Sequence, residues 1–195
     1  MLSLRESRRG AVGSALALHM VDELLRRDVP TVIVCSNGAR LVWQDEIGAP
    51  FNGSLAVWRE HPKFTFYPLN DLRAPIASGT YPTRGMVVIP ASMNSVASLA
   101  HGITGNLLLR AADVCLKERR RLVLMPRETQ LHSIHLENML TLARAGAVML
   151  PPEPAFYLHP KGIDDIVRFV VGRVLVALGL EEALPEDLQY RDRGD

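Results

Sequence analysis

The sequence predicts an α/β fold in which helices cover both faces of a parallel sheet, a three-layer and doubly wound arrangement. Segments with helical periodicity alternate along the chain with short aliphatic runs. These runs, such as MVVIP at 86–90 and LVLMP at 122–126, are apolar almost throughout, which is typical of parallel strands that are buried on both faces. The chain has 195 residues and a hydrophobic fraction of 48%, enough for one substantial core. We therefore predict a single domain over residues 1–195, with 180–195 as a C-terminal tail.

Each helix is predicted from the spacing of its apolar residues, and each strand from a short aliphatic or aromatic run. In the first helix Leu16, Met20 and Leu24 fall on one stripe, and Pro30 separates this helix from the strand TVIVC. In chain order the predicted elements are the helix 14–27, the strand 31–35, the helix 38–46, the strands 64–68 and 86–90, the helices 94–99 and 106–118, the strand 122–126, the helix 132–144, the strand 147–151 and the helix 163–178.

Two regions depart from this alternation. Residues 47–84 are predicted to be irregular around their single strand, because prolines and glycines interrupt them repeatedly. Residues 1–9 hold the place of a first, central strand, yet they contain the charged sequence SLRESRR. Burying its four charges in a central strand would be prohibitively costly. Either this strand is displaced or absent, or the natural chain begins elsewhere.

Composition and charge exclude several classes of protein. The formal net charge is +1, so no overall electrostatic field attracts nucleic acid. No apolar run approaches the roughly 18 residues that a membrane span requires, and the N-terminus lacks the apolar segment of a secretory signal. The two cysteines, Cys35 and Cys115, lie inside predicted elements, which suits reduced thiols in a reducing compartment. We therefore expect a cytoplasmic protein.

Polar residues follow the strands at their carboxyl ends, where ligands bind in parallel sheets. Ser36, the turn Ser92-Met93-Asn94-Ser95 and Arg127 each come after a different strand. The two serine-containing turns lead into helices, whose free N–H groups and positive dipole ends favour a phosphate. Each serine taken alone fits an ordinary N-cap. Together with the small-residue turn 10–14, the three edges favour a nucleotide-like ligand.

Basic residues bracket the strand 122–126. Arg110 and Lys117 are seven residues apart on one helix, which separates them by about 10 Å along its axis. Arg127 follows the strand at its other end, and a five-residue strand is about 17 Å long. One copy of the chain cannot easily bring Lys117 and Arg127 together, so their shared use requires a neighbouring subunit. For residues 119–121 an alternative is a solvated turn whose cations stabilise the end of the helix dipole.

Several motifs in combination resemble those of the flavin prenyltransferase family, the UbiX-like enzymes, over roughly residues 10–190. They are SNGA, NDLRAPIASGT, PxSxxS, RAADVxLKERRxLVLxxRET, HLENM, GAVxxPPxPAFY and DDxVxxVxGR. The resemblance implies a flavodoxin-like, Rossmann-like flavoprotein that forms a homo-oligomer, commonly a dodecamer, with active sites at subunit junctions. It also implies transfer of the dimethylallyl group of dimethylallyl phosphate to N5 and then C6 of reduced FMN, without a metal. The prenylated FMN would serve a UbiD-like decarboxylase as partner.

Matching the family's motifs residue by residue implies roles for positions of this chain. The implied cofactor site consists of Gly10, Ala11, Val12, Ser36, Ser92, Met93, Asn94, Ser95 and Arg127. The implied prenyl-phosphate site consists of Arg110, Lys117, Tyr157 and Arg173 together with Glu128, and the candidate catalytic residues are Glu46, Glu128 and Lys117. Two phosphate ligands would explain a cluster of cations in an otherwise neutral chain. Two alternatives stay open, a helix-surface carboxylate for Glu46 and a packing role at the sheet edge for Tyr157.

One position departs from the family's pattern. Val12 stands where the family usually has the serine of GASG, and an isopropyl group cannot donate a hydrogen bond to flavin N5. We therefore expect normal FMN binding with slow turnover. Two other functions stay open, a non-catalytic FMN-binding homologue and a relative of the flavin-dependent cysteine decarboxylases. The second is disfavoured because the catalytic histidine and substrate loop of those enzymes are not evident in this sequence.

Overall fold

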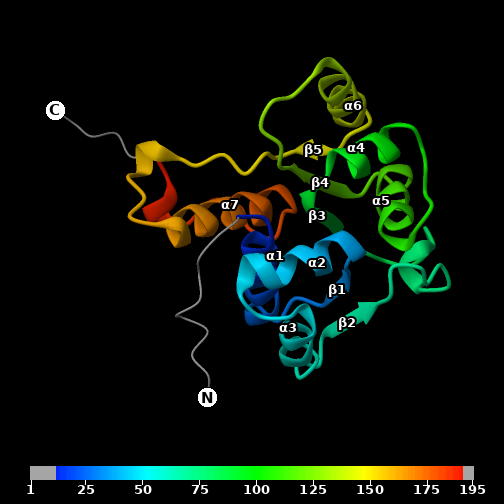
Figure 1. Ribbon diagram of the computed structural model, residues 1–195, viewed down its shortest axis with the longest axis horizontal. Coiled ribbons are helices and arrows are strands. Elements are labelled where there is room, and N and C mark those ends of the chain that lie inside the picture. The colour runs from blue at the N-terminus through cyan, green and yellow to red at the C-terminus, as the bar shows by residue number, and fades with distance from the viewer. Residues whose placement is uncertain (1–11, 191–195) are drawn as a thin grey trace.

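The computed structural model describes residues 12–190, except for the side chain of Val12, and residues 1–11 and 191–195 lie outside it. Every predicted helix and strand is present, although the ends differ by a few residues and the last strand is short (Figure 1). In chain order the elements are α1 (Val12–Arg26), β1 (Thr31–Val34), α2 (Asn37–Ile47), α3 (Phe51–Trp58), β2 (Phe64–Tyr67), η1 (Pro75–Ala77), β3 (Gly85–Ala91), α4 (Met93–Ala100), α5 (Leu107–Lys117), β4 (Arg121–Pro126), α6 (Ser133–Arg144), β5 (Val148–Met149), η2 (Phe156–Leu158), α7 (Ile163–Ala177) and η3 (Glu186–Leu188).

The strands are parallel, as predicted, and within the described residues they form two sheets. β1 pairs with β2, while β4 lies between β3 and β5. Thr31 lies opposite Phe64 in the first sheet, and Met86 lies opposite Leu122 in the second. The charged segment 1–9, which holds the place of a first central strand in the sequence, lies outside the described residues. α1 contacts both β1 and β3, so this helix joins the two sheets.

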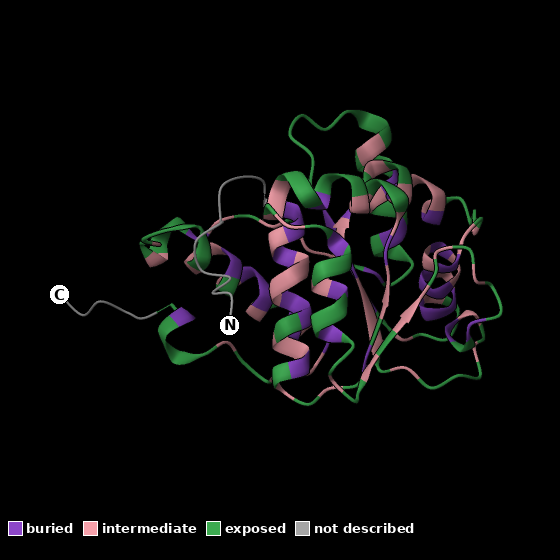
Figure 2. Ribbon diagram, turned by 60° about the horizontal axis from the view of Figure 1, so that its bottom comes forward, coloured by how far each residue is buried: buried purple, intermediate pink, exposed green. Residues whose placement is uncertain are grey.

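β4 forms the centre of the three-layer core. Leu122, Val123, Leu124 and Met125 are all 0% exposed. Because successive side chains of a strand point to opposite faces, Leu122 and Leu124 pack against α4, α5 and α6, while Val123 and Met125 pack against α1 and α7. The helices turn their buried positions inward and their exposed positions outward (Figure 2). Burial on both faces is the reason why the sequence of β4 is apolar without alternation.

The structure corrects one prediction, because α3 is a helix where the sequence indicated a loop. Phe51, Leu55 and Trp58 fall on one face of α3, and their exposed fractions are 6%, 5% and 4%. Trp43 of α2 packs edge-to-face on two of them, with ring centroids 5.3 Å from Phe51 and 5.9 Å from Trp58. Gly53 inside the helix costs about 1 kcal/mol relative to alanine. Burial of each large apolar side chain contributes about 1.5–3 kcal/mol, so packing outweighs the glycine.

The segment after α7 packs back onto α1 and α7. Arg27 of α1 forms an ion pair with Glu181, and Arg168 Nη2 of α7 lies 2.5 Å from Asp187 Oδ2. Leu188 is 7% exposed and anchors η3. Residues 180–190, the first part of the predicted C-terminal tail, therefore pack against one side of the core.

Candidate active site

The first turn of α1 meets two of the predicted site residues, Glu46 and Arg127. The backbone N–H of Ser14 donates to Glu46 Oε2 over 2.6 Å, and Arg127 Nη2 lies 4.0 Å from Glu46 Oε1. Gly13 completes the cluster, because a Cβ at this position would lie 3.1 Å from Pro90 Cγ and 3.2 Å from Arg127 Nε. Because glycine has no side chain, the backbone at residue 13 can approach Pro90 and Arg127 closely.

Glu46 belongs to α2, but its carboxylate accepts a hydrogen bond from the first turn of α1. The free N–H groups and the dipole give the first turn of a helix a partial positive charge, which a carboxylate stabilises. Arg127 adds a second positive charge on the other side of Glu46. The Glu46 side chain is 10% exposed, compared with 49% for Arg127, so the alternative of a helix-surface carboxylate is wrong. The cluster combines a proton acceptor with a guanidinium that is open to an anion.

Ser36 and Ser92 are both helix N-caps at the carboxyl ends of parallel strands. Ser36 Oγ accepts a hydrogen bond from the N–H of Ala39 over 3.1 Å. Ser92 Oγ accepts from the N–H of Ser95 over 3.2 Å and lies 3.0 Å from Ser95 Oγ. The N-cap alternative is therefore confirmed for both serines. It does not exclude ligand binding, because a hydroxyl has one donor and two acceptor positions.

The chemistry of these groups fits the phosphate ester of FMN. Two capped helix starts supply hydroxyls and N–H groups at one edge of the strands, and the half-exposed Arg127 at that edge supplies a fork of donors. Met93 and Asn94 form the first turn of α4. Gly10 and Ala11 lie outside the described residues, and of Val12 only its place at the start of α1 is described.

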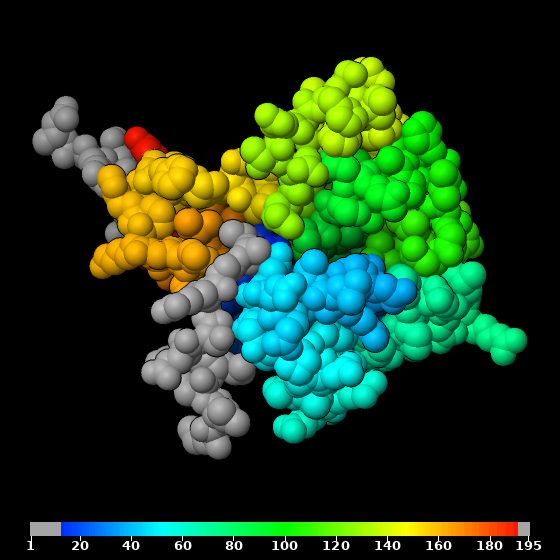
Figure 3. All heavy atoms as spheres, in the orientation of Figure 1, coloured from blue at the N-terminus to red at the C-terminus, as the bar shows by residue number. Residues whose placement is uncertain are grey.

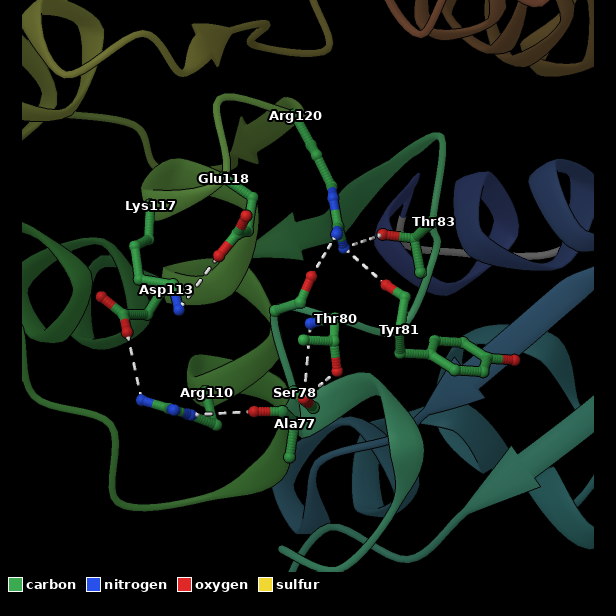
Figure 4. A network of polar contacts seen from close by, with 11 residues as sticks. Ala77, Ser78, Thr80, Tyr81, Thr83, Arg110, Asp113, Lys117, Glu118 and Arg120 are labelled. Carbon is green, nitrogen blue, oxygen red and sulfur yellow. Dashed lines mark hydrogen bonds and ion pairs between the residues drawn. The ribbon is translucent and has the colours of Figure 1, made fainter.

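Lys117, the last residue of α5, lies at the opposite end of β4 from Arg127, whereas Arg110 lies near the start of the same helix. Arg110 Nε donates to the carbonyl oxygen of Ala77 over 3.1 Å, and Lys117 Nζ lies 3.0 Å from Glu118 Oε1 (Figure 4). The six residues of β4 separate Lys117 from Arg127, a length of about 20 Å. The structure agrees with the expectation that one copy of the chain does not bring these two cations together.

The three arginines that follow α5 differ in their surroundings. Arg119 is exposed and has a φ of 56°. Arg120 Nη1 donates to Thr83 Oγ1 over 3.0 Å, and Arg121 Nη1 donates to the carbonyl oxygen of Leu178 over 2.7 Å. The alternative of a solvated turn is therefore wrong for Arg120 and Arg121, whose guanidinium groups hold other segments of the chain.

Tyr157 lies in η2, on the side of the molecule opposite α5. Figure 3 shows its segment in gold on one side and α5 in green on the other. Tyr157 is 55% exposed, which contradicts the alternative that its ring seals the edge of the sheet. Beside η2 lies an open hollow of about 500 Å³ whose lining includes Phe156 and Ile163. Arg173, on α7, is also exposed and has no hydrogen bond or ion pair with another residue in the range 12–190.

Within one copy, the structure therefore gathers only part of the predicted site. Glu46, Arg127 and the two serine turns lie along the carboxyl ends of the strands. Glu128 follows Arg127 and accepts a hydrogen bond from the N–H of Thr129 over 3.2 Å, so it also lies at this end. Lys117 lies beyond the other end of β4, Arg110 lies near the start of α5, and Tyr157 lies in η2, before α7.

Three contributors to these contacts could not be identified from the sequence. Gly13 and the N–H of Ser14 join the Glu46 cluster through the backbone, for which the only sequence signal is the small-residue turn 10–14. Arg120 was indistinguishable from its two arginine neighbours. No pattern in the sequence predicts which of three consecutive arginines contacts a loop that lies about forty residues earlier.

The described residues give little support for a metal site, a membrane-spanning helix or a nucleophilic cysteine. In the part of the chain from 12 to 190, no three His, Cys, Asp or Glu side chains converge as a metal site. None of the helices in that range has the length and apolar character needed to cross a bilayer. Burial raises the pKa of the Cys35 and Cys115 thiols, although Arg40 and Arg120 respectively oppose the effect. A raised pKa disfavours the nucleophilic thiolate.

Comparisons with known proteins agree with this geometry. The family described as Flavoprotein matches residues 8–175. The flavin prenyltransferase UbiX of Alkalihalophilus pseudofirmus is 44% identical over 180 residues, which cover 90% of both chains. The structure of AnUbiX in complex with FMN and dimethylallyl pyrophosphate is 38% identical and superimposes with a TM-score of 0.85 over 95% of both chains. A dodecameric FMN-dependent UbiX-like decarboxylase from Escherichia coli O157:H7 is 43% identical, with a TM-score of 0.81 over 89% of this chain and 92% of that one. The predicted flavodoxin-like fold is confirmed, and the chain belongs to the flavoprotein family and, within it, to the UbiX-like flavin prenyltransferases.

Proposed function

We propose that this chain transfers the dimethylallyl group of dimethylallyl phosphate to N5 and C6 of reduced FMN. The observation that carries the proposal is the cluster of Glu46, Arg127 and the Ser14 N–H, which lies at the edge where α2 and α4 also begin. Identity of 44% to a flavin prenyltransferase over nine tenths of the chain supports the same conclusion. FMN supplies the reduced ring that receives the prenyl group.

The residues at the carboxyl ends of the strands bind and orient the flavin. Arg127 and the hydroxyls of Ser36, Ser92 and Ser95 donate to its phosphate, which the N-terminal dipole of α4 also favours. Glu46 is shielded from water by its burial and accepts the proton that C6 loses when the ring becomes aromatic again. A carboxylate held beside a guanidinium and a backbone N–H stays in one orientation for that transfer.

The prenyl phosphate is held by Arg110, Lys117, Tyr157 and Arg173, with Glu128 beside them. Because these residues lie on separate sides of one copy, the site forms where copies meet, with Arg110 and Lys117 supplied by a neighbour. The dodecameric assembly of the Escherichia coli relative supports a homo-oligomer of this kind. We propose a dodecamer here as well, with the prenylated FMN passing to a UbiD-like decarboxylase.

Incubation of the purified chain with reduced FMN and dimethylallyl phosphate tests the proposal. The expected result is a flavin product whose mass has increased by one dimethylallyl group, detected by mass spectrometry after the protein is removed. Lys117→Ala should give much less product at the same FMN occupancy, because a charge-assisted contact to phosphate is worth about 1.5–3 kcal/mol.

A wild-type chain that binds FMN but leaves its mass unchanged would contradict the proposal and would favour a non-catalytic FMN-binding protein. Arg119→Ala is the matched control for Lys117→Ala, because Arg119 is exposed and lies only two positions further along the same turn. Its product yield should equal that of the wild type.

A further inference from the structure

Lys117 and Glu118 form the ion pair drawn in Figure 4. The turn at Gly79 lies directly against this pair. A Cβ at Gly79 would lie 2.3 Å from Glu118 Oε1 and 2.9 Å from Lys117 Nζ, closer than real Cβ atoms approach other atoms. The backbone φ of Gly79 is not positive, so its conformation does not require glycine. The requirement is space, and that space is occupied by the Glu118 carboxylate and by the Lys117 ammonium group that it pairs with.

Arg120 fixes the same turn against the end of α5. Its Nη2 donates to the carbonyl oxygen of Gly79, while Nη1 donates to the carbonyl oxygen of Tyr81 over 2.8 Å and to Thr83 Oγ1 over 3.0 Å. Arg119 has the left-handed φ of 56° that commonly ends a helix, so the chain turns sharply just before Arg120. One guanidinium thus holds three points of the loop 79–83.

Arg110 holds the residues that precede this loop. Its Nε donates to the carbonyl oxygen of Ala77 over 3.1 Å, and its Nη1 lies 3.5 Å from Asp113 Oδ2. Ser78 Oγ and Thr80 Oγ1 lie 2.9 Å apart across the turn between the two arginines. The two arginines therefore hold the backbone around Gly79 in place, and the end of the Lys117 side chain lies against it.

We infer that Gly79 and Arg120 are positioning residues, which set the place of the Lys117 ammonium group for the phosphate of the prenyl donor. This inference rests on the proposed function, in which Lys117 reaches a site shared with a neighbouring copy. Gly79 leaves room for the ammonium group, Glu118 holds it by charge, and Arg120 keeps the supporting turn in place. Each of the two residues acts through Lys117 and contacts no reacting atom itself.

Gly79→Ala tests this inference without disturbing the core. The atoms that a Cβ would displace are the far ends of two exposed, flexible side chains, so the fold should survive while the ammonium group moves. We expect KM for dimethylallyl phosphate to rise by about three- to tenfold, a part of the effect of losing a charge-assisted contact. The affinity for FMN should stay within about twofold of the wild type, because in the proposed function Lys117 contacts the phosphate of the prenyl donor and not the flavin.

Gly105→Ala is the matched control, because a Cβ at Gly105 would meet no atom within 4 Å. Its KM should equal that of the wild type. The decisive comparison is the double variant Gly79→Ala/Lys117→Ala against Lys117→Ala alone. If Gly79 acts through Lys117, the glycine substitution adds nothing once the ammonium group has been removed.

Three results separate the possible failures. An active wild type with an unchanged KM in Gly79→Ala overturns the inference and leaves the proposed function intact. An equal rise in KM caused by Gly79→Ala with and without Lys117 would also overturn the inference and leave the proposed function intact. A wild type that produces no prenylated flavin overturns the proposed function, and the inference with it.

Thr83→Val provides a second variant should Gly79→Ala not fold. It removes one acceptor of Arg120 and nearly preserves the side-chain volume, so the turn loosens while its shape is kept. The expected result is the same selective rise in KM, which Lys117→Ala should again abolish. An unchanged KM in a folded Thr83→Val variant would count against the positioning role of Arg120.

Discussion

Glu46 uses one carboxylate oxygen to hold the Ser14 N–H and presents the other to Arg127. We predict that Glu46→Gln folds normally, because the amide oxygen can still accept the Ser14 hydrogen bond. Turnover should fall by about 10²–10⁴, the range typical for loss of a general base, while FMN affinity changes little. Single-turnover formation of prenylated FMN, together with an FMN titration, measures both quantities.

A Glu46→Gln variant with unchanged turnover would show that this carboxylate is only a cap for α1. Glu60→Gln is a control for the loss of one negative charge, since Glu60 is exposed on another part of the surface. It should leave both turnover and FMN affinity at wild-type values.

Tyr157 and Arg173 are exposed in the single copy, so their substitution should not unfold the chain. We predict that Tyr157→Phe or Arg173→Ala raises KM for dimethylallyl phosphate far more than it weakens FMN binding. For Arg173→Ala the rise should be about ten- to a hundredfold, because a charge-assisted contact to phosphate contributes about 1.5–3 kcal/mol.

Tyr190→Phe is a matched control for Tyr157→Phe, because the two rings lie 6.3 Å apart and each substitution removes one hydroxyl. Steady-state kinetics with dimethylallyl phosphate as the varied substrate should distinguish the two variants. Equal losses of FMN affinity and prenyl-phosphate affinity in Tyr157→Phe or Arg173→Ala would point to a purely structural role.

Val12 lacks the hydroxyl that the resemblance to the family's GASG motif implies at this position. The proposed phosphate contacts come from other residues, so FMN binding should not depend on residue 12. We predict that Val12→Ser raises turnover at saturating substrates, because a hydroxyl can orient the flavin and relay a proton. Unchanged turnover in an FMN-bound Val12→Ser variant would show that residue 12 does not lie at N5.

At the scale of elements, α1 is held at both ends by charged contacts. Glu46 lies at its first turn, and Glu23 near its last turn accepts hydrogen bonds from Arg26 and Arg27. The hydrogen bond from Arg26 is the main cause that lowers the pKa of Glu23 from 4.5 to about 2. Arg27 also pairs with Glu181, so the same cluster connects α1 to the segment after α7.

This lowered pKa predicts a pH dependence of stability. A carboxylate whose pKa is lower in the folded state stabilises the protein fully above its unfolded pKa, near 4.5. That contribution is lost as the pH falls from about 4.5 to about 2. After allowance for solvent screening we expect about 1 kcal/mol.

Urea unfolding of Glu23→Gln and the wild type at several pH values measures this contribution. The variant should be less stable at pH 7, and the difference should shrink as the pH approaches about 2. A difference that stays constant over this range would mean that the charge of Glu23 does not contribute.

At the scale of the whole molecule, the candidate site residues lie too far apart to act within one copy. Lys117 and Arg127 lie beyond opposite ends of β4, and Tyr157 lies on the far side from α5. A closed homo-oligomer solves this separation, because symmetry brings the same two surfaces together at every junction. Light scattering should therefore find an assembly, and an active monomer would contradict the shared site.

Mixing two variants of low activity provides a sharper measurement. If Arg127 and Lys117 of different copies form each site, then Arg127→Ala and Lys117→Ala subunits refolded together should regain activity. About a quarter of the junctions would then combine an intact residue of each kind. Mixed assemblies with no more activity than the separate variants would show that both residues must come from one copy.

The sequence determined the α/β class, the order of the elements and the positions of most candidate residues. Strands such as β4 are apolar on both faces because helices cover both faces, so burial leaves a direct pattern in the sequence. The helix starts at Ser36 and Ser92 were also visible, since capping is a local interaction between a side chain and the next turn. α3 was missed because its apolar spacing competed with prolines and glycines.

Only the tertiary structure decided which of these residues meet. The contact of Glu46 with the start of α1 spans thirty-two positions of sequence, and the bonds from Arg120 to the loop 79–83 span about forty. Such contacts depend on how helices pack over a sheet, so the local periodicity of the sequence does not predict them. The sequence alone could not distinguish the solvated Arg119 from the anchored Arg120. The physical reason is that a guanidinium binds whatever carbonyl oxygen the fold brings within reach, and the fold is set by the burial of other residues.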